Sequence, residues 1–181
     1  MKVEKTLAIL VLISLIIKYM GISAGGPLSI VLIGTLSVVY LPGGFYFFSD
    51  KGIKNQNVLL SIFSGIVASL FAMVLLFKTM YWVGGRPMLL VSCVLVPFLT
   101  LLIWLMGMKP KDELVGYYKA MKFRFAIFTV LTFLMLMIPS ESLIQFQYRN
   151  EPRKAELAVR SYQGTITPEE EVELRGLHQK N

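Results

Sequence analysis

Long apolar stretches separated by short polar connectors constrain this chain more than any other feature of its sequence. A hydrocarbon core of about 30 Å is crossed by about 20 helical residues, and within lipid a helix satisfies its own backbone groups. About five such helices are predicted: 6–22, 27–48, 58–77, 87–108 and 125–146, the last interrupted by Pro139. Apolar residues make up 55% of the chain and the mean hydropathy is +0.65. We therefore expect an all-α, polytopic membrane protein.

The charged residues divide the chain into two regions. Residues 1–146 are expected to form a transmembrane helical domain, and residues 147–181 a charged, partly helical extramembrane tail. Basic and acidic residues balance in the tail, so the net charge of +7 belongs to the membrane region. Lysine and arginine at helix ends bind anionic headgroups, which favours the lipid bilayer as a partner and argues against nucleic acid.

The tail carries local signals for two short helices. Thr167-Pro168-Glu169-Glu170 has the pattern of a capping box with proline at the first helical position, predicting a helix to about Leu177. A helix over 153–162, closed by Gly164, is also predicted. Helices of this length are not stable alone in water, so they need each other, the membrane surface or a partner.

An internal repeat relates the first two predicted hairpins. A shift of 60 residues aligns Lys18, Gly25 and Pro27 with Lys78, Gly85 and Pro87. We expect two related helical hairpins followed by one helix, with the paired glycines ending the first helix of each hairpin. A cleavable signal peptide or signal anchor is the alternative interpretation of the first helix, and the repeat argues against its removal.

The connectors set the expected orientation. Nine lysine and arginine residues lie on the side of the N-terminus, including Lys51, Lys54, Lys119, Lys122 and Arg124. Only three lie in the opposite turns. The positive-inside rule places the first side in the cytoplasm of a bacterial inner membrane. Basic residues close to the last helix leave the side of the tail open.

Small residues form two rows at four-residue spacing in the third predicted helix, and such rows allow close backbone approach in lipid. The helix-packing candidates are Ser61, Ser64, Gly65, Ala68, Ser69 and Ala72. We expect them to pack against another helix, either within the chain or in a second copy or another membrane protein.

Lys18, Lys78 and Glu141 are the candidate intramembrane polar residues. Charged groups cost a few kcal/mol in the bilayer, so they snorkel, form pairs or serve transport. Snorkelling is the favoured interpretation for both lysines, with a polar interior as the alternative for Lys18. Glu141 either pairs with a lysine from another helix or marks a helix end near water.

No catalytic or metal site is predicted, and no cofactor is expected. The single cysteine, Cys93, and the single histidine, His178, cannot form a zinc site or a disulfide framework. No phosphate-cradling loop or nucleophile motif occurs. We therefore expect a protein that is not an enzyme.

The hairpin at Phe77-Lys78-Thr79-Met80-Tyr81-Trp82-Val83-Gly84, followed by Met88-Leu89-Leu90, resembles the inner-membrane motor protein of gliding motility and type IX secretion. The resemblance covers about 35 residues. It implies that Lys78 matches a lysine linked to proton-driven motion in that family. The partner glutamate has no counterpart, because 87–108 contains no acid.

Two functions are favoured, and a membrane enzyme ranks third because no convergent polar groups are recognised in the sequence. The first is a non-enzymatic envelope-assembly component, related to motility or secretion. The alternative is a small transporter or channel in which Lys18, Lys78 and Glu141 line a path.

Overall fold

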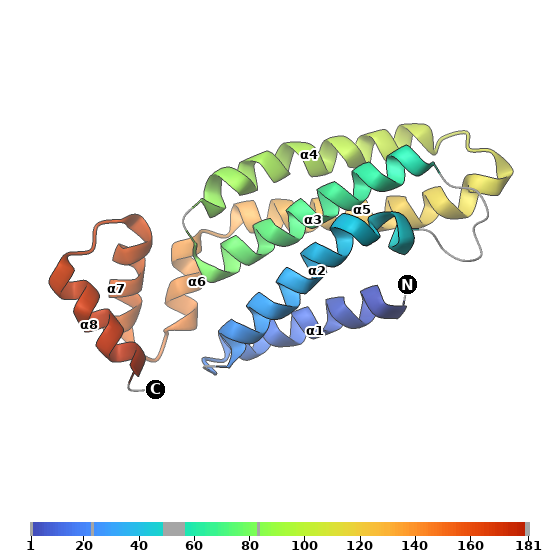
Figure 1. Cartoon of the computed structure of the whole chain (residues 1–181). Coiled ribbons are helices and arrows are strands. Elements are labelled where there is room, and N and C mark those ends of the chain that lie inside the picture. Colours follow the sequence, from blue (N-terminus) through green and yellow to red (C-terminus); the bar gives the residue numbers. More distant parts are fainter. Residues whose placement is uncertain (1, 23, 49–56, 83, 180–181) are drawn as a thin grey trace.

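The computed structural model (Figure 1) describes residues 2–22, 24–48, 57–82 and 84–179. Lys51, Lys54 and Val83, which the sequence analysis used, lie outside these described residues. The described residues contain eight α-helices and no strand. The helices are α1 (Lys2–Tyr19), α2 (Gly25–Phe48), α3 (Val58–Met80), α4 (Gly85–Met106), α5 (Val115–Met137), α6 (Ser140–Gln147), α7 (Pro152–Gln163) and α8 (Pro168–Gln179), with a 3-10 turn at Asp112–Leu114. The predicted all-α class is confirmed.

The five long helices run side by side, and successive helices are antiparallel (Figure 1). The N-terminus lies at one end of the bundle, and α6, α7 and α8 lie at the opposite end. Helix α3 is central: it packs most extensively against α2 and also contacts α4, α5 and α6. The C-termini of α1, α3 and α5 therefore meet at the end that carries the tail.

Three segments are long and apolar enough to cross a membrane: Val58–Met80, Gly85–Met106 and Asp112–Met137. The apolar part of α2 with described side chains, Gly25–Leu41, is shorter, and α1 carries charged residues at both of its ends. Large apolar side chains cover the outside of the bundle, such as Leu59, which is 82% exposed, and Val94, which is 68% exposed. An outer surface of this kind suits lipid and not water.

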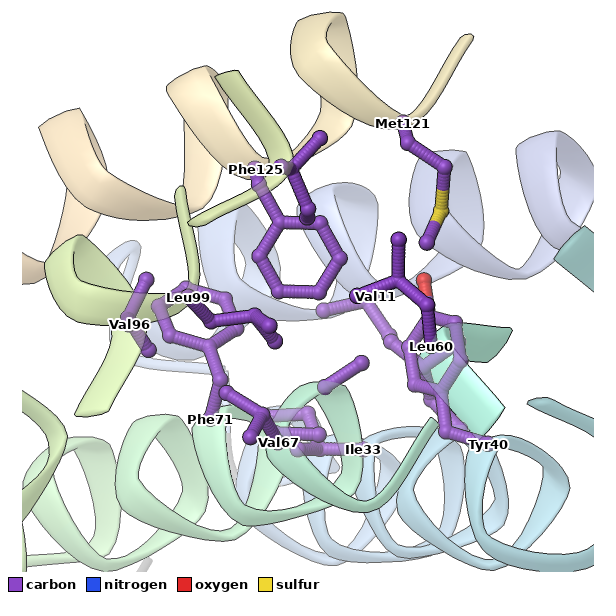
Figure 2. Close-up of a cluster of buried hydrophobic side chains, with 14 of the residues drawn as sticks. Val11, Ile33, Tyr40, Leu60, Val67, Phe71, Val96, Leu99, Met121 and Phe125 are labelled. Carbon is purple, nitrogen blue, oxygen red and sulfur yellow. The ribbon is translucent and has the colours of Figure 1, made fainter. Parts of the chain in front are cut away.

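One apolar core joins the long helices. Figure 2 shows side chains from all five of them meeting around α3. The rings of Phe71 on α3 and Phe128 on α5 stack with centroids 4.7 Å apart, and Phe125 meets Phe128 edge-on at 5.5 Å. Aromatic pairs in these geometries add to the dispersion contacts on which helix packing in lipid depends.

The first hairpin is held by a close backbone approach. Helix α1 ends at Tyr19, and Gly21 supplies the left-handed turn with φ of +83°. Gly25 begins α2 instead of ending α1, so the predicted role of this glycine was wrong. A Cβ atom on Gly25 would lie 2.4 Å from the Cα atom of Lys18, so only glycine fits there. In the second hairpin, Gly84 likewise precedes α4, as its N-cap.

The fifth predicted helix, 125–146, was wrong in its bounds. Helix α5 begins ten residues earlier, at Val115, and includes Lys119 and Lys122, which were assigned to a connector. It ends at Met137 because proline disfavours a helical conformation of the preceding residue, and Ile138 is extended. Glu141 therefore lies in the first turn of α6 and outside any candidate span.

The two tail helices form where the sequence predicts them. The Thr167 amide donates to the Glu170 carboxylate over 3.0 Å, and the Glu170 amide donates to the Thr167 hydroxyl over 3.3 Å. This confirms the capping box. Gly164 ends α7 with φ of +69°. Fully buried Leu157 and Ile144, from helices α7 and α6 that pack together, help fix the tail to the bundle.

Candidate functional site

Lys18 lies in the last turn of α1 and is only 5% exposed. Its ammonium group donates a hydrogen bond to the Thr79 carbonyl, near the end of α3. The same ammonium lies 4.6 Å from the ring centre of Tyr81 and 5.5 Å from that of Tyr19. These contacts place the charge against a neighbouring helix end and two aromatic faces, where a cation is electrostatically favoured.

Lys78 repeats this arrangement on the next pair of helices. It lies in the last turn of α3 and donates to the Ile138 carbonyl, the C-cap of α5, over 2.8 Å. The acceptors lie 61 and 60 residues after Lys18 and Lys78 respectively. Because the last carbonyls of a helix have no partner within it, each lysine satisfies a group that lipid would leave unsatisfied.

A cavity of about 340 Å³ lies beside Lys18, and we call it the Lys18 pocket. Tyr81, Gln147, Glu151 and Lys154 are among its lining residues. The Tyr81 hydroxyl donates to the Gln147 side-chain oxygen over 3.1 Å, and Lys154 and Glu151 form an ion pair of 3.3 Å. Each of these four polar side chains thus has a partner within the pocket.

A second cavity, of about 330 Å³, lies beside Lys78, and we call it the Lys78 pocket. Trp82, Arg86, Glu141 and Tyr162 are among its lining residues. Glu141 attracts the Lys78 ammonium and Arg86 repels it, but Lys78 and Glu141 do not form a direct ion pair. Within the described part of the chain, neither Arg86 nor Glu141 makes a hydrogen bond or an ion pair.

The two pockets are lined in part by residues that lie 60 positions apart in the sequence, the same shift that relates the two predicted hairpins. Five residues that line the Lys18 pocket are each followed 60 positions later by a residue that lines the Lys78 pocket. The first five are Lys18, Ile22, Gly26, Met80 and Tyr81, and their counterparts are Lys78, Trp82, Arg86, Ser140 and Glu141. The structure brings Lys78 and Glu141 into one pocket and places Lys18 in the other.

The predicted helix-packing residues lie inside the bundle. Ser61, Ser64, Gly65, Ala68, Ser69 and Ala72 are all buried on α3. The Ser69 hydroxyl is 2.9 Å from that of Ser37 on α2, and the Ser61 hydroxyl is 2.7 Å from that of Tyr117 on α5. Packing within this one chain therefore buries the small-residue rows.

Sequence reasoning missed an ion pair at the other end of the bundle. Glu4 on α1 pairs with Arg124 on α5 at 2.8 Å and accepts a hydrogen bond from Tyr40 on α2 over 3.2 Å. Both charged side chains are nearly nine-tenths buried. Glu4 lies among lysines at the start of the chain, and a separation of 120 residues from Arg124 leaves no local signal.

Exposed ion pairs join α7 to α8. The Arg153 guanidinium lowers the pKa of Glu173 by donating to its carboxylate, and the Thr167 amide lowers the pKa of Glu170 in the same way. Arg160 also pairs with Glu170, at 2.5 Å. These contacts orient α8 on α7, although each exposed pair contributes little to stability.

The described residues contain no cluster of histidine, cysteine, aspartate or glutamate side chains that is able to hold a metal ion. The charged groups of the Lys78 pocket are suited to binding a ligand that carries both a positive and a negative charge.

Comparison with protein families, curated proteins and solved structures gave no match for this chain.

Proposed function

We propose that this chain is a non-enzymatic protein of a bacterial inner membrane that crosses the bilayer five times and supports an envelope assembly. The observation that carries the proposal is the use of polar side chains inside the bundle. Lys18, Lys78 and the Ser37–Ser69 contact join one helix to another. Hydrogen bonds between helices make the bundle more rigid.

Five spans are supported by the lengths of the helices. Helices α1 and α2 have 18 and 24 residues and lie alongside α3, α4 and α5, which have 22 or 23. At 1.5 Å per residue, all five extend for about 27 to 36 Å, close to the thickness of the hydrocarbon core. With a cytoplasmic N-terminus, an odd number of spans places the tail on the outer side.

The fixed tail supports a role in assembly. Leu157 and Ala155 are buried on α7, and Lys154 donates to the Leu177 carbonyl of α8 over 3.4 Å. The Lys154 contact joins α8 to α7, and α7 packs on α6, while Val172 on α8 remains 70% exposed. A rigid, partly apolar surface beside the membrane reduces the entropy lost when a partner binds. A relation to motility or secretion rests on the resemblance of the second hairpin alone.

Crosslinking tests this function in native membranes. A photoreactive amino acid replaces Val172, and a control protein carries it at lipid-facing Val94. We expect one defined protein adduct from position 172 and lipid adducts from position 94. A protein that yields no adduct at position 172 and purifies in mild detergent as a strict monomer, with no companion, contradicts the proposal.

A small transporter is the second candidate, and two charged pockets at one end of the bundle favour it. Lys18, Lys78 and Glu141 then form part of a path for ions or small solutes. Reconstituted vesicles test this candidate through ion flux driven by a gradient. Flux that is absent, or that is unchanged after Lys18→Leu, Lys78→Leu and Glu141→Leu, eliminates it.

A further inference from the structure

We infer that the Lys78 pocket binds the headgroup of a phospholipid that carries both a phosphate and a primary ammonium, as phosphatidylethanolamine does. The inference needs the chain to lie in a bilayer, and it does not depend on the proposed role in assembly.

The first argument is the position of the pocket. It lies where α3 ends, α4 begins and the chain turns from α5 into α6, and Tyr162 of α7 also lines it. Helix ends of this length reach the headgroup region, and half-exposed Trp82 is of a residue type that prefers this region. A phospholipid alongside α3 and α4 therefore carries its headgroup to this depth.

The second argument is the unused hydrogen-bonding capacity of the two cations. Lys78 donates one hydrogen bond, to Ile138, which leaves two of its three N–H groups. The five donors of Arg86 have no partner among the described side chains and backbone groups. A phosphate diester accepts such charge-assisted hydrogen bonds, and arginine binds it in a bidentate manner.

The third argument is the acidic side of the pocket. Glu141 brings a carboxylate with no hydrogen-bond donor within the structure as described, and this group repels a ligand that is only anionic. A primary ammonium supplies three donors to the carboxylate, and the faces of Trp82 and Tyr162 attract a cation. A headgroup with both charges therefore satisfies both sides of the pocket, within a volume typical of ligand sites.

The Lys18 pocket lacks this combination. Gly26 replaces the arginine and Tyr81 replaces the carboxylate, while its remaining charges, Lys154 and Glu151, already pair with each other. The Lys18 pocket is therefore an internal control for headgroup binding.

Native mass spectrometry of the full chain, released from defined lipid mixtures, tests the inference. We expect phosphatidylethanolamine to be retained about tenfold more strongly than phosphatidylglycerol or phosphatidylcholine, the equivalent of one charged hydrogen bond. Glu141→Gln is expected to abolish this preference, and Arg86→Gln to weaken retention of all three lipids. Glu113→Gln, an exposed change at the other end of the bundle, is the matched control.

Several outcomes would overturn the inference. Equal retention of the three lipids, or a preference that survives Glu141→Gln, removes the assigned role of the carboxylate. Displacement of the lipid by millimolar soluble phosphoethanolamine shows that the headgroup alone is recognised and that a free phosphoester is the ligand. Elution volume and thermal unfolding of each variant separate loss of binding from loss of fold, and Arg86→Lys provides a second, milder variant.

Discussion

The Lys18 and Lys78 pockets are built on corresponding positions, yet they distribute charge differently. At the Lys18 pocket the lysine lies between aromatic rings, and the nearby Lys154 and Glu151 neutralise each other. At the Lys78 pocket Arg86 and Glu141 have no direct partner among the described groups. Two cavities of similar volume thus differ in pairing: the charges of the Lys18 pocket have partners, whereas Arg86 and Glu141 in the Lys78 pocket have no direct partner among the described groups. Much of this difference lies at two positions, where Gly26 and Tyr81 line one pocket and Arg86 and Glu141 line the other.

The largest expected difference in stability is between alanine substitutions of the two glycines that follow Lys18 and Lys78. Gly25→Ala places a methyl group 2.4 Å from the Lys18 Cα atom, a clash with backbone that no side-chain rotation relieves. We expect a loss of about 3 kcal/mol in unfolding free energy. Gly85→Ala meets its nearest atom, the Phe77 carbonyl oxygen, at 3.4 Å and should change stability by less than about 1 kcal/mol. Thermal unfolding in detergent measures both. Equal effects would contradict the close packing of the first hairpin.

Replacing Lys18 should likewise reduce the unfolding free energy more than replacing Lys78. Lys18→Met removes a charged hydrogen bond to Thr79 and two aromatic contacts, for an expected loss of about 2 kcal/mol. Lys78→Met removes one hydrogen bond, together with the attraction from Glu141 and the smaller repulsion from Arg86, for a loss of about 1 kcal/mol. Denaturant titration of both variants against the parent measures the difference. A larger loss at Lys78 would reverse the structural assignment of the pockets.

Two acidic residues sharpen the comparison between a paired and an unpaired carboxylate. Glu4→Gln breaks a largely buried ion pair with Arg124, and we expect a loss of about 2 kcal/mol. Glu141→Gln removes only a longer-range attraction to Lys78 and should cost less than about 0.5 kcal/mol. Thermal unfolding at low and moderate salt measures both variants. A large loss for Glu141→Gln would mean that this carboxylate is structural.

The smallest effect is expected from acidification of the tail. The pKa values of Glu170 and Glu173 are lowered in the folded chain, so both groups favour the docked α8 above their ordinary value of 4.5. This contribution is lost as the pH falls below 4.5 and through the lowered values. Helix α8 also supplies the Leu177 carbonyl that accepts from Lys154, a residue of the Lys18 pocket.

Spin labels on α7 and α8 measure this loosening as a broader distance distribution at acidic pH. Arg153→Gln is the control, because it removes the contact that lowers the Glu173 pKa and should weaken the pH response. A second label pair, across α3 and α5 near the Lys78 pocket, should remain unchanged. An unchanged α7–α8 distance at all pH values would contradict the role of these carboxylates.

Much of the fold could be predicted because its signals are local. The capping box at Thr167 and the left-handed Gly164 depend on residues within a few positions, and both predictions are confirmed. Pro139 was also recognised, but its effect was predicted as an interruption of one helix. The structure instead shows a full end of α5 at this proline and a separate α6.

The candidate site could be predicted only in part. The sequence identifies three candidate residues because they are charged and lie in or near apolar segments: Lys18, Lys78 and Glu141. Their partners are backbone carbonyls, and these have no sequence signature. Helices far apart in the chain supply the remaining contacts, so these could not be predicted before the helices pack. They are the contributions of Arg86 and Tyr162 to the Lys78 pocket and the Glu4–Arg124 ion pair. Tertiary packing thus decides which charges find a partner.

The lysine contacts have a consequence for biosynthesis. The carbonyl that accepts from Lys18 belongs to a residue translated 61 positions later, and that of Lys78 to one translated 60 positions later. When the first hairpin leaves the insertion machinery, its ammonium group has not yet met its acceptor. If all five long helices insert, as proposed, we expect this group to stay near the lipid boundary until the third helix emerges, and we expect the same delay before the fifth. Maturation of this bundle in the membrane is therefore expected to proceed in steps, each completed by the arrival of the next odd-numbered helix.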